Sequence, residues 1–321
     1  MNKATKKILL HYLLAPSLML LLLWLIYRQL GRNGDLSAQW QSLLANWQRG
    51  NALALAIVLA LAPINWMLEA VKWKMLLQKI QPLPYPRALA STLTGTAFAL
   101  VTPNKVGDFA GRILYLRNSN KLRAAIAVLI SNLSQTLVTY FFGIVGLVFF
   151  SIRYRSAWAF PVLMLALVSA ALLAFLYLRI DLVARWAEGR KCLRKIVISI
   201  RVVKRYSRRD LWLLMAVACI RFVVYNFQFV LLANVSGAGL PWAEGLLLSA
   251  LMFWMITVIP SIFLADLGVR GFVAGLLFTD TGLTHNSVAI LAGSYLIWLL
   301  NLVLPAIMGS ALVLSIRFGE D

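Results

Sequence analysis

Long apolar stretches alternate with short polar connections along most of the chain. A stretch of about 18 or more apolar residues is long enough to cross a bilayer as an α-helix. No segment is long and polar enough to be a separate soluble domain, so the pattern predicts an all-α polytopic membrane protein with a single domain over 1–321. Six stretches are predicted to be full spans: 8–27, 52–71, 123–150, 157–178, 211–234 and 286–315.

Two further apolar stretches, 88–119 and 242–279, are broken by polar residues. The first break reads Thr102-Pro-Asn-Lys-Val-Gly-Asp-Phe-Ala-Gly-Arg112, and the second reads Ile259-Pro-Ser-Ile-Phe-Leu-Ala-Asp-Leu-Gly-Val-Arg270. Each has a Pro, then a Gly and an Asp close together, then an Arg four residues after the Asp. Each stretch is either one interrupted span or a re-entrant helical hairpin that enters and leaves on the same side.

The distribution of Lys and Arg favours the hairpins. With a cytoplasmic N-terminus and two hairpins, 179–209 lies inside with its eleven basic residues. If 88–119 crossed fully, this loop would move outside, against the positive-inside rule. For 242–279 only Arg317 and the likeness of the two breaks favour a hairpin, because 234–258 and 271–316 contain no Lys or Arg. We therefore expect the protein to be in the cell (inner) membrane, with both termini on the cytoplasmic side.

Two hairpins of opposite origin imply an inverted-topology repeat. The first repeat covers about 52–150 and the second about 211–315. Each contains a span, a hairpin and another span, and the spacing of spans between them inverts the second copy. The two broken tips are then expected near each other at the midplane, because irregular backbone is tolerated there only when buried in protein or lining a wet cavity.

The breaks carry charges at a depth where each costs about 2.5–3.5 kcal/mol on insertion scales. Asp108 and Asp266 are expected to cap the returning half-helices, with Arg112 and Arg270 one turn later on the same face. Each Asp–Arg pair either only fixes its hairpin or also faces, with Lys105, an anionic headgroup near the half-helix termini.

Other polar residues lie within the spans. Glu69 and Lys72 are one turn apart and could satisfy each other, with the Lys72 ammonium snorkelling to the interface. Arg221 has no acid in its own helix, so its partner is Glu69, Asp108, Asp266 or a ligand. The predicted substrate-binding residues are Pro103, Asn104, Lys105, Gly107, Asp108, Arg112, Pro260, Ser261, Asp266, Gly268, Arg270, Arg221, Glu69, Lys72, Asn132, Gln135 and Asn226.

The net charge of +20 lies in short loops between apolar runs, so it follows membrane topology and predicts no nucleic-acid partner. Neither the two Cys nor the two His have neighbours at metal-ligand spacing. No catalytic residue, metal or cofactor is therefore predicted. Residues 36–49 place apolar side chains at helical spacing, which is typical of a helix at the outer interface or of one packed on the bundle.

These motifs resemble the lysylphosphatidylglycerol synthase transmembrane region, a flippase-like family. The first break is similar to the family's Pro-x-x-x-Gly-acid…Arg, and Pro260…Leu267-Gly-Val-Arg270 is similar to its second motif. Lys72-Trp73 is similar to the family's basic residue–Trp pair. The likeness runs from about residue 8 to 316. Larger members add a cytosolic domain that transfers an aminoacyl group from tRNA to phosphatidylglycerol, and no such domain is expected within 1–321.

The resemblance therefore implies a lipid flippase, and not an aminoacyl-lipid synthase. Asn132 and Gln135 stand where related proteins often carry an acid, which favours an anionic substrate: an anionic phospholipid or a polyprenyl phosphate. Gly271 replaces a usual Glu, and Asp266 stands where Gly is common. The alternatives are a membrane enzyme that modifies lipid headgroups and a non-transporting scaffold. The expected partners are membrane lipids, and a homo-oligomer is compatible with the sequence.

Overall fold

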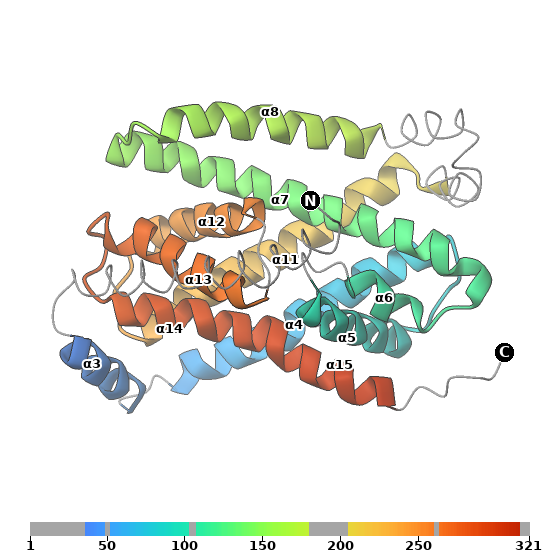
Figure 1. Cartoon of the computed structure of the whole chain (residues 1–321), viewed down its shortest axis with the longest axis horizontal. Helices are drawn as coiled ribbons and strands as arrows, with labels where there is room; N and C mark the ends of the chain where they lie inside the picture. The colour runs from blue at the N-terminus through green and yellow to red at the C-terminus, as the bar shows by residue number, and fades with distance from the viewer. Residues whose placement is uncertain (1–35, 49–51, 103–106, 180–204, 260–262, 315–321) are drawn as a thin grey trace, which may run out of the picture.

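The computed structural model describes residues 36–48, 52–102, 107–179, 205–259 and 263–314. These residues form helices that run mostly along the long axis of the molecule, and no strand occurs among them (Figure 1). Five of the helices are long and apolar enough to cross a membrane. The chain is therefore an all-α polytopic membrane protein, as predicted. The predicted span 8–27 lies outside the described residues.

The first four of these helices differ from the predicted spans by at most six residues at either end. They are α4 (Ala52–Leu77), α7 (Lys121–Tyr154), α8 (Ala159–Leu178) and α11 (Arg208–Val235). The last span differs from the continuous helix expected over 286–315. It consists of α14 (Ser287–Trp298), a π-helical turn η7 (Leu299–Val303) and α15 (Leu304–Leu314). π-Helical turns inside α-helices frequently occur at functional sites.

The first broken stretch forms α5 (Tyr85–Val101) and the short α6 (Gly107–Ile113), which pack side by side. Its two flanks meet: the Gln81 side-chain oxygen accepts hydrogen bonds from the Arg117 amide at 3.1 Å and from Asn120 Nδ2 at 3.2 Å. The chain thus leaves the end of α4 and returns to the same end of the molecule before α7 begins.

The second broken stretch forms α12 (Trp242–Val258), α13 (Phe263–Ala274) and a π-helical turn η6 (Gly275–Thr279). Its flanks also meet, because Thr284 Oγ1 donates to the Ala238 carbonyl at 2.7 Å and Asn286 Nδ2 to that of Gly237 at 3.2 Å. Since α11 runs from one end of the molecule to the other, the two hairpins start from opposite ends (Figure 1).

The first helix of each hairpin packs on the last span of the other half. α5 packs against α15, and α12 packs against α7, while α4 and α11 pack against each other at the centre. Glycines allow the close approaches. A Cβ on Gly309 of α15 would collide with the Leu93 carbonyl of α5, and one on Gly143 of α7 would collide with Trp254 of α12.

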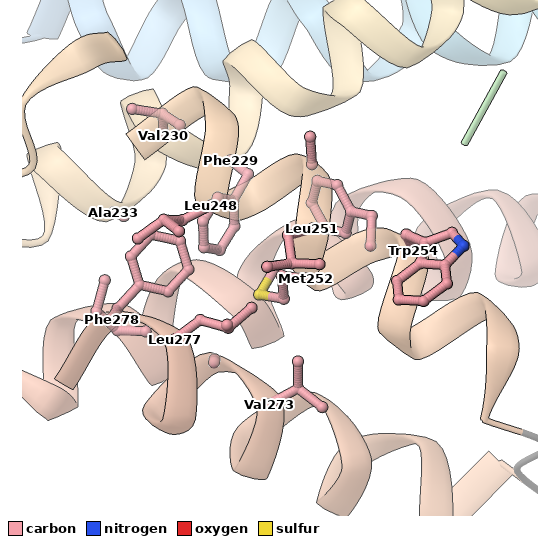
Figure 2. Packing of buried hydrophobic residues seen from close by; sticks show 14 of the residues in the cluster. Phe229, Val230, Ala233, Leu248, Leu251, Met252, Trp254, Val273, Leu277 and Phe278 are labelled. Atoms are coloured by element: carbon pink, nitrogen blue, oxygen red, sulfur yellow. The ribbon is translucent and has the colours of Figure 1, made fainter. Parts of the chain in front are cut away.

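Two apolar clusters stabilise this arrangement. The larger one joins α7, α11, α12, η6 and α14, and Figure 2 shows Phe229, Leu251 and Phe278 within it. The smaller one lies at the opposite end, where Trp73 and Tyr177 are fully buried.

The predicted helix over 36–49 is present as α3 (Leu36–Gln48). It packs on α14 through the buried Leu43, while Trp40, Leu44 and Trp47 stay exposed.

Candidate functional site

Glu69 on α4 is the centre of a buried ion-pair network. Its carboxylate lies 3.0 Å from Arg112 Nη2 of α6, 3.1 Å from Arg221 Nη1 of α11 and 3.3 Å from Lys72 Nζ. A single carboxylate thus connects a hairpin helix of the first half with a span of the second. Arg221 finds its partner in Glu69, one of the candidates that the sequence offered.

Arg112 is held by contacts from two other helices and from its own helix. Its Nε donates to Asp108 Oδ1 at 2.8 Å, and its guanidinium lies over the Trp73 ring, 5.4 Å from the ring centroid, as in cation–π contacts. The Trp73 indole N–H donates to Ser91 Oγ at 2.9 Å, and Ser91 Oγ donates to the Arg112 carbonyl at 3.0 Å. The Lys72-Trp73 pair therefore supplies one cation to the network and the aromatic support for another.

Gln135 of α7 closes the network. Its Oε1 lies 3.1 Å from Arg221 Nη1 and 3.5 Å from Lys72 Nζ. The network holds three cations (Lys72, Arg112 and Arg221) and two carboxylates, so its formal charge is positive. Arg112 Nη1 and Arg221 Nε are buried and have no hydrogen-bond partner among the described residues. Buried unpaired charge is costly, and an anion would reduce that cost.

A cavity lies beside this network, between α4, α5, α11, η7 and α15. Its volume is about 30 Å³, close to the space that one water molecule takes up. We call it the Glu69 cavity. It is lined by Trp66, Glu69, Thr92, Leu93, Thr96, Arg221, Asn301 and Pro305. Charge and motif signals pointed to Glu69 and Arg221, whereas the hydroxyls and the indole carried no such signal.

A chain of amides crosses the bundle next to the cavity. Asn65 Nδ2 donates to Asn301 Oδ1 at 2.7 Å, and Asn301 Nδ2 donates to Gln228 Oε1 at 2.8 Å. Gln228 Nε2 then donates to the Val58 carbonyl at 2.8 Å. Asn301 lies in the π-helical turn η7, so the irregular backbone directs this amide toward α4 and α11. The amide chain ties the last span to the two central helices.

The second break builds a separate group around Arg270 on α13. Arg270 Nε lies 3.0 Å from Asp266 Oδ2, both side chains are buried, and the guanidinium also interacts with the Tyr225 hydroxyl of α11. Arg270 Nη1 is a further buried donor with no partner in the part of the chain that the structure describes. Since Tyr225 is four residues after Arg221, the two charged groups reach neighbouring turns of α11.

Several sequence predictions are corrected. Lys72 does not snorkel, since its side chain is only 1% exposed and pairs inside the protein. Asn132 is exposed on the outer face of α7 and does not join the site. Asp108 and Asp266 lie in the first turns of their helices and are not N-caps, because α6 begins at Gly107 and α13 at Phe263.

The remaining predicted residues have other positions. Asn226 binds the Leu246 carbonyl and Ser249 of α12, so it joins two helices away from the cavity. Gly107 packs tightly on α5, where a Cβ would collide with the Phe98 carbonyl, and Gly268 is buried in α13. Five predicted residues lie outside the described part of the chain: Pro103, Asn104, Lys105, Pro260 and Ser261.

Comparisons with known proteins agree with this architecture. None of the curated proteins compared with the chain matches it. The family described as Lysylphosphatidylglycerol synthase TM region matches residues 8–309, which include both hairpins and every charged residue of the two groups. The chain therefore belongs to the lysylphosphatidylglycerol synthase TM region family.

Proposed function

We propose that this protein moves a polar lipid with an anionic headgroup between the two leaflets of the cell membrane. The substrate class is an anionic phospholipid or a polyprenyl phosphate. The observation that carries the proposal is the buried excess of positive charge around Glu69, with unpartnered N–H groups on Arg112 and Arg221 among the described residues. A lipid phosphate would neutralise this charge, and membership of a lipid-related membrane family supports the same conclusion.

Alternating access is the mechanism that we propose. The reciprocal packing of α5 on α15 and of α12 on α7 supports an inverted repeat, with re-entrant hairpins from opposite sides. Both charged groups contact α11, through Arg221 and through Tyr225. A small rocking of one half against the other would then open the polar interior to one leaflet at a time, and the phosphate would pass while the acyl chains stay in lipid.

The charge distribution supports an orientation in which the α4–α5 loop faces the cytoplasm. That end of the bundle carries Lys79, Arg117 and Lys121, among other basic residues, and the opposite end of α7 carries Arg153 and Arg155. α15 ends at this basic end, and the predicted span 8–27 precedes α4, which begins at the opposite end (Figure 1). We propose on this basis that both termini are cytoplasmic.

The direct test is a leaflet-specific assay in proteoliposomes. Fluorescent phosphatidylglycerol is incorporated, and the fraction that a membrane-impermeant reductant bleaches is followed over time. We expect the wild-type protein to speed transfer, and Arg112→Ala and Arg270→Ala to slow it at least about tenfold, the effect of losing one charge-assisted hydrogen bond. Arg153→Ala is the matched control, because Arg153 is exposed at the far end of α7.

Two further readouts separate the alternatives. Arg112→Lys keeps the positive charge but loses the planar guanidinium that can donate two hydrogen bonds. It replaces Arg112→Ala in the transfer assay if the alanine variant does not fold. Transfer that is equally slow for wild-type and variant proteins would refute the proposal. Mass spectrometry of the recovered lipid should show an unchanged mass, whereas a changed mass would indicate a headgroup-modifying enzyme.

A further inference from the structure

The helix α3 is held on the second hairpin by one of its faces. Gln39, Leu43 and Asn46 have the i, i+4, i+7 spacing of one side of a helix, and Leu43 is buried. Gln39 Oε1 accepts a hydrogen bond from the Val288 amide of α14 at 3.3 Å. A Cβ on Gly237 would collide with Asn46 Nδ2, so the two residues are in close contact. We call the two flanks of this hairpin its base: 236–240 and 284–288.

Two other faces of α3 are free of the bundle and differ in polarity. The apolar stripe has exposed residues at the i, i+4, i+8, i+11 spacing of one side of a helix: Leu36, Trp40, Leu44 and Trp47. The polar stripe follows one residue later along the chain and is also exposed: Ser37, Gln41 and Gln48. α3 therefore has one face for protein, one for an apolar medium and one for water.

The surroundings of the apolar stripe indicate that lipid covers it. α3 contains no charged residue, as suits a helix that is only partly in water. The next helix, α4, begins at Ala52 and exposes Leu53 and Ile57 in its first turns, which is typical of a helix that faces lipid. From Gln48 to Ala52 the chain can span at most about 14 Å. The apolar stripe thus lies close to where the lipid-facing surface of α4 begins.

The tryptophans at this end of the bundle indicate the membrane–water interface. Trp242 begins α12 beside the base of the second hairpin, is exposed, and stacks on Phe227 with the ring centroids 5.4 Å apart. Trp47 is 40% exposed, yet its Nε1 donates to Ser236 Oγ at 3.4 Å. Tryptophan is enriched at this interface because its ring is apolar and its N–H is polar. Figure 1 shows α3 at the end of the bundle, beside the start of α14.

We infer that α3 lies in the headgroup region of the bilayer, with its apolar stripe in lipid and its polar stripe in water. There it anchors the base of the second hairpin to the membrane surface. In the orientation proposed above, this surface is that of the outer leaflet. The partner is the lipid interface itself, whatever its headgroups, so the inference does not depend on lipid transfer. The competing occupant of such a stripe is a second copy of this chain.

Spin-label accessibility in proteoliposomes tests the position of α3. In a background without the two native cysteines, a nitroxide is attached at Trp40→Cys or Leu44→Cys, and at Gln41→Cys as the matched control on the polar stripe. Electron paramagnetic resonance compares collisions with oxygen, which concentrates in the bilayer, and collisions with a water-soluble nickel complex. We expect the ratio of oxygen to nickel accessibility to be severalfold higher at positions 40 and 44 than at 41.

Hydrogen exchange in lipid nanodiscs tests the anchoring. The Val288 amide lies in the first turn of α14, where an amide has no partner within its own helix, and Gln39 supplies one. Trp40→Gln with Leu44→Gln should release α3 from lipid and raise the exchange rate of this amide about fivefold, which corresponds to losing the roughly 1 kcal/mol of one hydrogen bond. Gln41→Ala with Gln48→Ala is the matched control and should leave the rate unchanged.

Three outcomes would overturn the inference. Nickel accessibility that is as high at positions 40 and 44 as at 41 would place the apolar stripe in water. Low accessibility to both reagents at 40 and 44 would show that protein, such as a second copy of the chain, covers the stripe. An unchanged exchange rate at Val288 in the double glutamine variant would refute the anchoring of the hairpin. None of these readouts measures lipid transfer, so the proposed function is tested separately in the transfer assay.

Discussion

Gly95→Ala is the sharpest structural test of the charged hairpin. Gly95 lies on α5 directly beneath the Asp108–Arg112 pair of α6. A Cβ at this position would lie 2.5 Å from Asp108 Oδ1, 2.8 Å from Arg112 Cγ and 2.9 Å from the Asp108 carbonyl oxygen. One of these atoms is backbone, and the others belong to a buried ion pair, so no flexible side-chain end can simply move aside. The variant must push α6 away from α5 or break the pair.

The expected magnitude comes from a comparison with Gly245→Ala on α12. There a Cβ would meet only side-chain atoms of Val230 and Leu240, the nearest at 3.2 Å and 3.3 Å. Both glycines lie in helices, so the gain of about 1 kcal/mol in helix propensity cancels between the variants. Overpacking typically costs about 1–3 kcal/mol, so Gly95→Ala should be less stable than Gly245→Ala by about that amount.

The assay is reversible unfolding in mixed micelles titrated with sodium dodecyl sulfate, followed by tryptophan fluorescence. Lipid transfer by the same proteins gives a second readout, and we expect it to fall more for Gly95→Ala, because Asp108 and Arg112 are displaced. The reasoning is refuted if the free energies of unfolding of the two variants agree within about 0.5 kcal/mol, the usual scatter for neutral substitutions.

Three further predictions concern other parts of the structure. Asn301→Leu leaves two amides of the buried chain without a partner and should lower the free energy of unfolding by about 1–3 kcal/mol for each; unchanged stability would contradict the amide chain. Trp73→Phe removes one buried hydrogen bond and should lower the free energy of unfolding by about 1 kcal/mol more than Trp242→Phe does, because Trp242 is exposed. Equal effects of the two substitutions would contradict the Trp73–Ser91 contact. The third prediction tests the orientation in a background without the two native cysteines. A membrane-impermeant maleimide applied to whole cells should label His285→Cys but not Ser119→Cys, and both substitutions replace exposed residues. The reverse labelling pattern would contradict the proposed orientation.

The spans and breaks could be predicted because the bilayer imposes simple length and polarity rules. Five predicted spans are helices in the structure, and both predicted breaks divide two helices. The π-helical turns at Gly275–Thr279 and Leu299–Val303 could not be predicted. Their sequences look like ordinary apolar helix, although Asn301 in the second turn makes hydrogen bonds to α4 and α11.

The charged site could be predicted only in part. A charged residue within an apolar span stands out in the sequence, whereas an uncharged polar residue such as Thr or Trp does not. Glu69, Arg112 and Arg221 were identifiable as costly residues in need of partners. Thr92 and Trp66 look like ordinary helix residues, and only the packing of α4, α5 and α15 together shows that they line a cavity. The outward direction of Asn132 depends on the rotation of α7, which an apolar helix without a clear polar face leaves undetermined.

The energetics of the Glu69 network support the functional role that we propose for its charges. Buried ion pairs are weak contributors to stability, and apolar replacements of similar volume are often as stable. Gly107 and Gly111 also allow α6 to lie close against α5, so the charges are not the sole cause of this packing among the described residues. The network nevertheless holds five ionisable groups and leaves two cationic donors unpartnered within the described residues. An anion beside these two donors would reduce the cost of burying them, which is the property that the proposed phosphate site requires.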